Sequence, residues 1–110
     1  MLEGILGNAT AEKVLLYLEV YGEGYARAIA ATFDDLPVNM VQKQLERLEA
    51  GGVLVSQLKG RTRLFVWNPR FAFLDQLRAL LQKALSTLSE SDRRRYFTRR
   101  TRPRRTGKPL

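Results

Sequence analysis

The sequence predicts a small, mainly α-helical fold with one β-hairpin and a basic tail. Two observations support this fold class. Apolar residues recur at helical steps before residue 50 and again after residue 70. Between these regions, residues 53–67 are rich in β-branched, aliphatic and aromatic residues on both sides of Lys59-Gly60-Arg61, a sequence typical of a hairpin turn. With 110 residues, the chain has the length of one small domain.

The composition excludes several kinds of chemistry. The chain has no cysteine and no histidine, so it has no disulfide framework, no thiol nucleophile and no usual proton shuttle near neutral pH. Carboxylates are the remaining metal-binding side chains, and we expect no metal and no cofactor. The start, MLEGILGNA, lacks the basic region of a secretory signal, and no apolar run approaches the ~20 residues of a membrane span. These features favour a soluble, cytoplasmic protein without a membrane partner.

The formal net charge of +8 is concentrated at one end of the chain. Residues 91–110 alone have a net charge of +8, whereas the residues before them are neutral in sum. Within that neutral part, residues 1–36 have a net charge of −4 and residues 37–78 have a net charge of +4. A polarised body with a strongly cationic tail is favourable for binding a polyanion.

Two helices are expected at the start of the domain. Asn8 is a favourable N-cap for a helix over residues 9–21, where apolar residues follow helical spacing and glycines come after the last turn. A shorter helix over residues 25–33 has large apolar residues in steps of four. It is expected to end where Asp34-Asp35 opens a tight turn.

A third helix has two contrasting faces. It begins near Pro37, whose missing N–H is harmless in a first turn, and ends at Gly51 or Gly52. We expect its apolar stripe to be buried and its polar face to be exposed. The apolar stripe consists of Val38, Val41, Leu45 and Leu48.

The polar face of this third helix has the chemistry that reads duplex DNA. A helix fits the ~12 Å wide major groove, where amide side chains pair with adenine and Lys or Arg pairs with guanine. Asn39, Gln42 and Lys43 lie in the first two turns, the part of a helix-turn-helix that reaches the bases, and Arg47 further along is expected to contact phosphate. An ordinary solvated face is the alternative for this helix taken alone. The candidate DNA-binding residues of the helix are Val38, Asn39, Met40, Gln42, Lys43 and Arg47.

The hairpin tip is a second basic element. Lys59, Arg61 and Arg63 surround Gly60, with no acid nearby. Beside a DNA-reading helix, such a tip can lie along flanking phosphates or enter the minor groove. The alternative is that exposed edge strands often carry Lys or Arg to prevent sheet-to-sheet aggregation.

The region after the hairpin predicts a long helix over residues 71–88. Its apolar residues fall in steps of three and four, the spacing of a helix–helix seam. In a domain this small, such a stripe favours a second subunit over the protomer's own core, so we expect a homodimer. The expected interface residues are Leu74, Leu77, Leu81, Ala84, Leu85 and Leu88.

Residues 89–110 form an Arg-rich tail in which Ser89 and Asp92 can cap a short helix. Its cations can neutralise phosphates, each adding ~0.9 to the salt slope of DNA binding. The alternatives are RNA binding, a solubilising role, or docking on the protomer's own acidic N-terminal half. Tyr96 and Phe97 are expected to be small hydrophobic anchors. The candidate DNA-binding residues of the tail are Arg93, Arg94, Arg95, Arg99, Arg100, Arg102, Arg104 and Arg105.

Three segments together resemble a known family. AEKVLLYL, ARAIAATF and VQKQLERLEAGGVLVSQLKGRTRLFVWNP are similar to the prokaryotic winged helix-turn-helix transcriptional regulators, in particular the ArsR-like superfamily. The resemblance covers residues 5–88 and is most specific over residues 41–69. It implies a winged helix-turn-helix domain over residues 1–88, whose first helix and long C-terminal helix dimerise. It assigns base reading to Asn39, Met40, Gln42 and Lys43, and the wing to Lys59, Arg61 and Arg63.

The sequence departs from the family pattern in three places. The turn before the third helix reads FDDLP, without the usual glycine or serine, and places two acids near the expected DNA unless Asp35 caps the helix. The chain lacks the cysteine and histidine ligands of the family's metal sensors, so metal sensing of that kind is not expected. The Arg-rich tail lies outside the family pattern.

We therefore expect a dimeric, sequence-specific DNA-binding regulator that represses by occluding a promoter and is associated with the nucleoid when bound. Recognition helices of two subunits would enter successive major grooves about 34 Å apart. The alternative is a winged-helix interaction module, such as an antitoxin-like partner, whose tail binds RNA or an acidic protein. An enzyme is not expected, because the sequence has no phosphate-cradling glycine loop, no nucleophile–base pair and no metal-ligand cluster. The sequence identifies no effector ligand.

Overall fold

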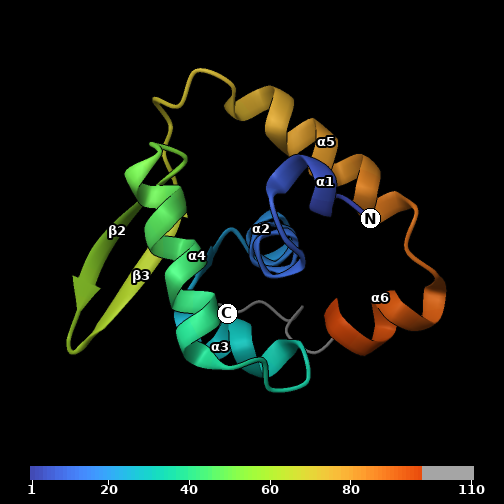
Figure 1. Ribbon diagram of the computed structural model, residues 1–110, viewed down its shortest axis with the longest axis horizontal. Coiled ribbons are helices and arrows are strands. Elements are labelled where there is room, and N and C mark those ends of the chain that lie inside the picture. The colour runs from blue at the N-terminus through green and yellow to red at the C-terminus, as the bar shows by residue number, and fades with distance from the viewer. Residues whose placement is uncertain (98–110) are drawn as a thin grey trace, which may run out of the picture.

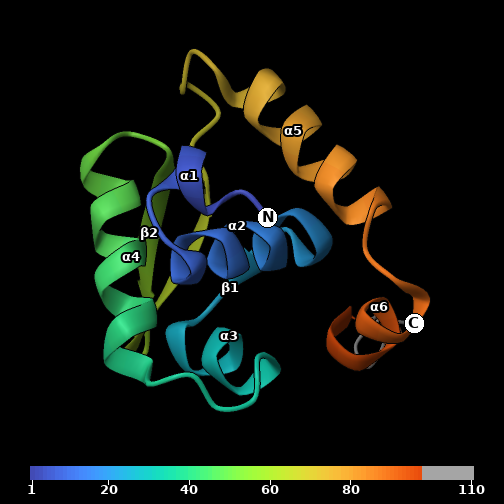
Figure 2. The ribbon, with the colours of Figure 1, turned by 45° about the vertical axis from the view of Figure 1, so that its right-hand side comes forward.

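The structure is a computed structural model that describes residues 1–97. These residues form six helices and one three-stranded antiparallel sheet. Helix α2 lies in the middle of the molecule, with other helices around it and the sheet at one side (Figure 1, Figure 2). In chain order the elements are α1 (Glu3–Leu6), α2 (Ala9–Tyr21), β1 (Glu23–Gly24), α3 (Ala26–Thr32), α4 (Val38–Ala50), β2 (Leu54–Lys59), β3 (Thr62–Trp67), α5 (Leu74–Ser86) and α6 (Glu90–Phe97).

The helices before the hairpin begin and end close to where the sequence indicates. The Asn8 side chain accepts a hydrogen bond of 2.7 Å from the Ala11 N–H, which confirms Asn8 as the N-cap of α2. Gly22 ends α2 in a left-handed conformation with φ +83°. Helix α4 lies between Pro37 and the double glycine, as expected, and Gly52 is the glycine of that pair with positive φ.

The turn between α3 and α4 has an unusual backbone. Asp34 and Asp35 have φ values of +60° and +58°, in the left-handed region that Asp tolerates better than most residues because its short side chain can bond locally. The N-cap position of α4 is Pro37, and no side chain caps the helix by a hydrogen bond. Asp35 therefore does not cap α4, and it lies exposed just before the helix.

The sheet contains a strand that the sequence pattern did not predict. Strand β1 pairs antiparallel with β3, in the strand order β1-β3-β2, so that Gly24 lies opposite Phe65. A Cβ atom at position 24 would lie 2.8 Å from Tyr17 Cε1 and 3.1 Å from Ile29 Cδ1. Glycine at this position thus lets the helices approach the sheet closely. Two residues are too few for an alternating pattern to be recognised in the sequence.

Strands β2 and β3 form the expected hairpin. Lys59 pairs with Thr62 across a two-residue turn whose first residue, Gly60, has φ +63°, as a type II′ turn requires. Phe65 is buried in the core, whereas Leu58 near the tip is 58% exposed. The hairpin is therefore packed on the helices at its base and projects from them at its tip.

The order of elements is compatible with the small winged-helix fold expected from the sequence. The core forms around α2, where Val14, Leu15 and Leu18 lie in one buried cluster with Ile29 of α3 and Leu45 of α4. The sheet covers one side of this cluster and α5 crosses another (Figure 2). Within residues 1–97, no helix is long and apolar enough to cross a membrane.

Helix α5 is shorter than expected. The sequence predicts a long helix over residues 71–88, but α5 spans only Leu74–Ser86. Thr87 is the residue after its last turn, and the Thr87 Oγ1 hydroxyl donates a hydrogen bond of 2.7 Å to the Ala84 carbonyl. Serine and threonine hydroxyls compete in this way with the helical backbone pattern. The described residues therefore contain no long C-terminal helix.

Helix α5 packs on α2 with part of the expected dimer seam. Leu81 and Ala84 are 0% and 4% exposed in the protomer's own core, which corrects the expectation that they face a second subunit, because little of their surface remains. Glu19 of α2 fixes the packing by accepting hydrogen bonds of 2.8 Å from both Arg78 Nε and Gln82 Nε2. The hydrogen bond to the Glu19 carboxylate raises the pKa of the Arg78 guanidinium.

Helix α6 joins the core instead of starting a separate tail. Ser89 Oγ accepts a hydrogen bond of 3.1 Å from the Asp92 N–H, which confirms the expected cap. Phe97 is buried, and its ring centroid lies 5.8 Å from that of Phe33 and 6.3 Å from that of Tyr21. The folded unit thus extends past the domain boundary that the sequence placed after residue 88.

Candidate nucleic-acid interface

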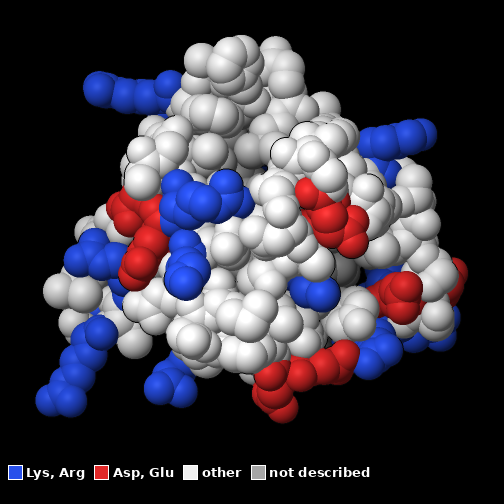
Figure 3. Space-filling model, viewed as in Figure 1, with Lys and Arg blue, Asp and Glu red and all other residues white. Residues whose placement is uncertain are grey.

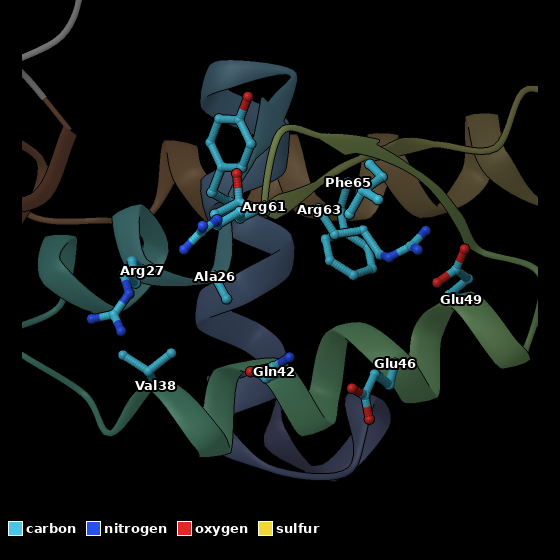
Figure 4. A pocket seen from close by; sticks show the side chains of 12 residues that line it. Ala26, Arg27, Val38, Gln42, Glu46, Glu49, Arg61, Arg63 and Phe65 are labelled. Atoms are coloured by element: carbon cyan, nitrogen blue, oxygen red, sulfur yellow. The ribbon is translucent and has the colours of Figure 1, made fainter.

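An open groove separates α4 from the hairpin (Figure 4). Its volume is about 460 Å³. Helix α4 forms one wall, the hairpin forms the other, and the start of α3 closes one end. The lining residues are Tyr25, Ala26, Arg27, Val38, Gln42, Glu46, Glu49, Leu58, Arg61, Thr62, Arg63 and Phe65.

Helix α4 has a buried face, an outer face and a face toward the groove. Val41 and Leu45 are fully buried, as expected for the apolar stripe. Asn39 and Lys43 are exposed on the outer face, and Gln42 lines the groove. Within residues 1–97, no hydrogen bond or ion pair engages these three polar side chains, so their donors and acceptors are available to a ligand.

The other residues of the expected DNA-reading set are placed differently. Val38 is half-buried and lines the groove, and Met40 is 45% exposed. Arg47 turns away, because its Nη2 donates a hydrogen bond of 3.1 Å to the Leu6 carbonyl and its Nε donates one of 2.9 Å to Gln44 Oε1. Arg47 therefore ties α4 to α1, and the structure does not bring it together with the outer-face residues.

The cations of the hairpin fall into two groups. Lys59 and Arg61 are exposed at the tip, on both sides of the Gly60 turn. Arg63 Nη1 instead donates a hydrogen bond of 3.1 Å to Ser56 Oγ, which in turn donates one of 2.8 Å to Glu49 Oε2. Figure 4 shows Arg63 and Glu49 pointing toward one another across the groove. This relay links the hairpin to the end of α4 and leaves the tip cations as the more accessible ones.

The groove has mixed charge, which the sequence did not predict. Glu46 and Glu49 of α4 line one wall, whereas Arg61 and Arg63 come from the hairpin. Figure 4 shows Arg27 and Arg61 at the end of the groove where α4 begins, and Glu49 toward the end where α4 finishes. The space-filling view likewise shows acidic side chains among basic ones on this face of the molecule (Figure 3). The groove is therefore cationic where α4 begins and of mixed charge toward the end of α4, where Arg63 lies beside Glu49.

Sequence reasoning missed the acidic wall and Arg27. Gln42, Glu46 and Glu49 follow one another in steps of four and three, which places them on one helical face, and this spacing could have predicted the wall. Arg27 lies in the first turn of α3, the helix that would cross the DNA backbone in a helix-turn-helix. Its position in that helix could have assigned it to phosphate contact.

The described arginines of the expected tail are engaged within the protomer. Arg93 Nη2 donates a hydrogen bond of 2.8 Å to the Leu85 carbonyl, and Arg94 forms an ion pair inside α6. Arg95 Nη2 lies 2.6 Å from Asp34 Oδ2 in the turn before α4. Helix α6 is thus docked on the acidic N-terminal half, one of the alternatives open from the sequence. Five further candidates lie outside the described residues, namely Arg99, Arg100, Arg102, Arg104 and Arg105.

An apolar surface near α5 is the candidate for subunit contact. A groove of about 400 Å³ lies between α1, α4 and α5, and Ile5 and Phe73 at its edge are 71% and 65% exposed. Large apolar side chains exposed together are typical of an interaction surface. Four residues of the expected seam remain partly exposed, namely Leu74, Leu77, Leu85 and Leu88.

Neither a metal site nor a known relative adds to this description. In the part of the chain that the structure describes, no three Asp or Glu side chains come together to hold a metal ion. Comparisons of the chain with models of protein families, with curated proteins and with solved structures give no match. The geometry and chemistry of the surface around α4 are therefore the basis for assigning a function.

Proposed function

We propose that this chain is a winged helix-turn-helix protein that binds specific DNA sequences and regulates transcription in the cytoplasm as a homodimer, repressing by occlusion of a promoter. The observation that carries the proposal is the exposure of Asn39, Gln42 and Lys43 in the first two turns of α4, without partners among residues 1–97. Amide groups match the two-atom edge of adenine, and an ammonium matches the acceptors of guanine.

The charge of the groove also favours the start of α4 as the part of the helix that contacts DNA. Arg27 and Arg61 lie at the end where α4 begins (Figure 4), and Lys59 is exposed at the hairpin tip, where it pairs with Thr62. Cations on both sides of a recognition helix can neutralise the phosphates that flank a major groove. Toward the end of α4, Glu46 and Glu49 would oppose phosphate, with Arg63 offsetting part of the charge of Glu49. The start of α4 is thus the part of the helix that the charges favour as the reading surface.

A second subunit would place two reading surfaces on one duplex. The partly exposed leucines of α5 and the neighbouring apolar groove, with Ile5 and Phe73 at its edge, support a homodimer formed through this region. Two recognition helices in successive major grooves are about 34 Å apart, so the bound sequence would be a near-palindrome with that half-site spacing.

Selection from a random duplex pool, followed by fluorescence anisotropy on the selected sequence, tests the proposal. Asn39→Ala and Lys43→Ala should each weaken binding to the selected sequence by about 5- to 150-fold, the effect of losing one base contact. Lys83→Ala is the matched control, because it removes the same charge from an exposed position on α5. The proposal is wrong if no sequence is enriched, or if Lys83→Ala and Lys43→Ala have equal effects.

A winged-helix interaction module is the second candidate. The acidic wall of the groove, formed by Glu46 and Glu49, favours it because a surface of mixed charge suits a protein partner as well as a polyanion. For such a module, the random pool would yield no preferred duplex, and Asn39→Ala with Lys43→Ala would leave partner binding intact. The same pair of variants therefore distinguishes the two functions.

A further inference from the structure

The apolar groove between α1, α4 and α5 has the size and lining of a small-molecule site. Its volume of about 400 Å³ falls within the ~300–1,000 Å³ that is usual for such sites. Its lining includes Leu15 and Leu48, which are 1% and 8% exposed, and Ile5 and Phe73, whose side chains are largely exposed. A bound apolar molecule would therefore rest on buried leucines and cover exposed apolar side chains, and both contacts favour binding.

One cation accompanies these apolar side chains. Arg47 is the one charged residue among the described residues that line the groove. Its guanidinium has five N–H donors. The Leu6 carbonyl accepts a hydrogen bond of 3.1 Å from Nη2, and Gln44 Oε1 accepts one of 2.9 Å from Nε. Within residues 1–97 no other group accepts from Arg47, so three donors on Nη1 and Nη2 remain for a ligand.

We propose that this groove binds a small carboxylic acid with an apolar body, whose carboxylate pairs with Arg47 and whose body lies against Leu48, Leu77 and Phe73. A carboxylate can accept two parallel hydrogen bonds from one guanidinium, which makes it a good match for the unused donors. A neutral apolar molecule would leave these donors without acceptors. The combination of one cation with an otherwise uncharged lining thus selects an acid that is apolar at its other end.

A second copy of the chain suits this groove less well than a small acid. In a twofold contact both subunits use the same surface. The groove of each copy would bring another Arg47 and, among the described lining residues, no acid to pair with it. Leu74, Leu85 and Leu88 are partly exposed outside the groove lining and remain available for subunit contact.

A bound acid would act on DNA binding through its charge. Arg47 comes four residues after Lys43, which is about 6 Å further along α4. This distance is below the ~8 Å Debye length at physiological salt, so a carboxylate on Arg47 lowers the positive potential where we propose that α4 reads DNA. The acid should therefore weaken DNA binding, and by linkage DNA should weaken binding of the acid by the same factor. This consequence rests on the proposed function, whereas the site itself does not.

Calorimetric titration of the full chain without DNA tests the site, with octanoate and octanol as probes of equal chain length. Octanoate should bind about 10-fold more tightly than octanol, because only the carboxylate forms charge-assisted hydrogen bonds with the partly screened Arg47. Arg47→Gln should remove this difference and leave octanol binding unchanged. Phe73→Ala should weaken binding of both probes by a similar factor, because it removes apolar surface from the edge of the groove.

Two further variants keep the test decisive. Arg70→Gln is the matched control, because it removes the same charge from an exposed residue that does not line the groove, and it should keep the preference for octanoate. Arg47→Lys retains the cation without the paired donors and should show an intermediate preference, even if Arg47→Gln unfolds. Equal affinities for octanoate and octanol, or equal effects of Arg47→Gln and Arg70→Gln, would overturn the site. So would a failure of both probes to bind while Phe73→Ala converts a dimer to monomers, because a second copy would then be the occupant.

The effect on DNA is measured separately, on the selected duplex. Saturating octanoate should weaken binding of the unmodified chain by about 5-fold, whereas octanol and the Arg47→Gln variant should show no such effect. Octanoate binding without a change in DNA affinity would overturn the regulatory role and leave the site intact. Absence of any preferred duplex, with the preference for octanoate retained, would contradict the proposed function and not the site.

Discussion

Replacing Gly24 by alanine tests the close approach that joins the helices to the hairpin. The added Cβ would lie 2.8 Å from Tyr17 Cε1 and 3.1 Å from Ile29 Cδ1. Tyr17 and Ile29 are 5% and 0% exposed, so neither side chain can swing into solvent to make room. Because Gly24 pairs with Phe65, the strand must move away from α2 and α3 and take β3 with it.

The expected cost follows from this geometry. Adding a methyl group to a well-packed core destabilises a protein by about 1–3 kcal/mol. For a domain of this size, each kcal/mol lowers the melting temperature by about 4–8 °C, so Gly24→Ala should melt about 4–24 °C below the unmodified chain. Gly4→Ala is the matched control, because an added Cβ on this exposed α1 residue has nothing within 4 Å. Alanine is favoured over glycine in a helix, so this control should lose no stability.

Thermal unfolding followed by circular dichroism, together with urea denaturation, measures both variants. A second substitution, Ile29→Val, removes the methyl group that lies 3.1 Å from the added atom, so the double variant should lose less stability than the two single losses together. The reasoning is refuted if Gly24→Ala melts within about 2 °C of the unmodified chain, or if the two losses add.

Three further changes probe a helix cap, an ion pair and a wing cation. Asn8→Ala removes the acceptor for the Ala11 N–H and should lower the free energy of unfolding, measured by urea denaturation, by about 1 kcal/mol. An unchanged urea midpoint would show that the cap is dispensable. Glu19→Gln weakens the bonds to Arg78; the Glu19 side chain is 2% exposed and that of Arg78 is 44% exposed, so solvent screens only one partner, the expected loss is about 1 kcal/mol or more, and an unchanged free energy of unfolding would contradict a stabilising role. Lys59→Ala should reduce the salt slope of DNA binding by about 0.9 without changing the preferred sequence, and a changed preference would mean that Lys59 contacts bases.

The features that the sequence predicted correctly depend on neighbouring residues in the chain. Asn8 and Ser89 accept hydrogen bonds from N–H groups three residues ahead, so the cap can be recognised from a few letters. Gly60 is recognised in the same way, because a two-residue hairpin turn needs positive φ at its first position. The bounds of α4 follow from Pro37 and the double glycine on its two sides.

The features that the sequence did not predict depend on what lies opposite a residue in space. Nothing local shows that Arg47 meets the Leu6 carbonyl, since the two residues are far apart in the chain. Leucine spacing in α5 could not show that Leu81 faces α2 of the same protomer, because a seam looks alike whether its partner is the core or a second subunit. The strand at Gly24 was missed because its identity as a strand comes entirely from pairing with Phe65.

The acidic wall of the groove explains how a short helix could be held in one orientation on DNA. Glu46 and Glu49 lie on the same side of α4 as Gln42, but one and two turns further along. A duplex that slid toward the end of α4 would bring its phosphates against these carboxylates, which is unfavourable even though Arg63, linked to Glu49 through Ser56, offsets part of their charge. The cations Arg27 and Arg61 favour the opposite end (Figure 4). Attraction at one end and repulsion at the other would together restrict base contact to the first two turns of α4.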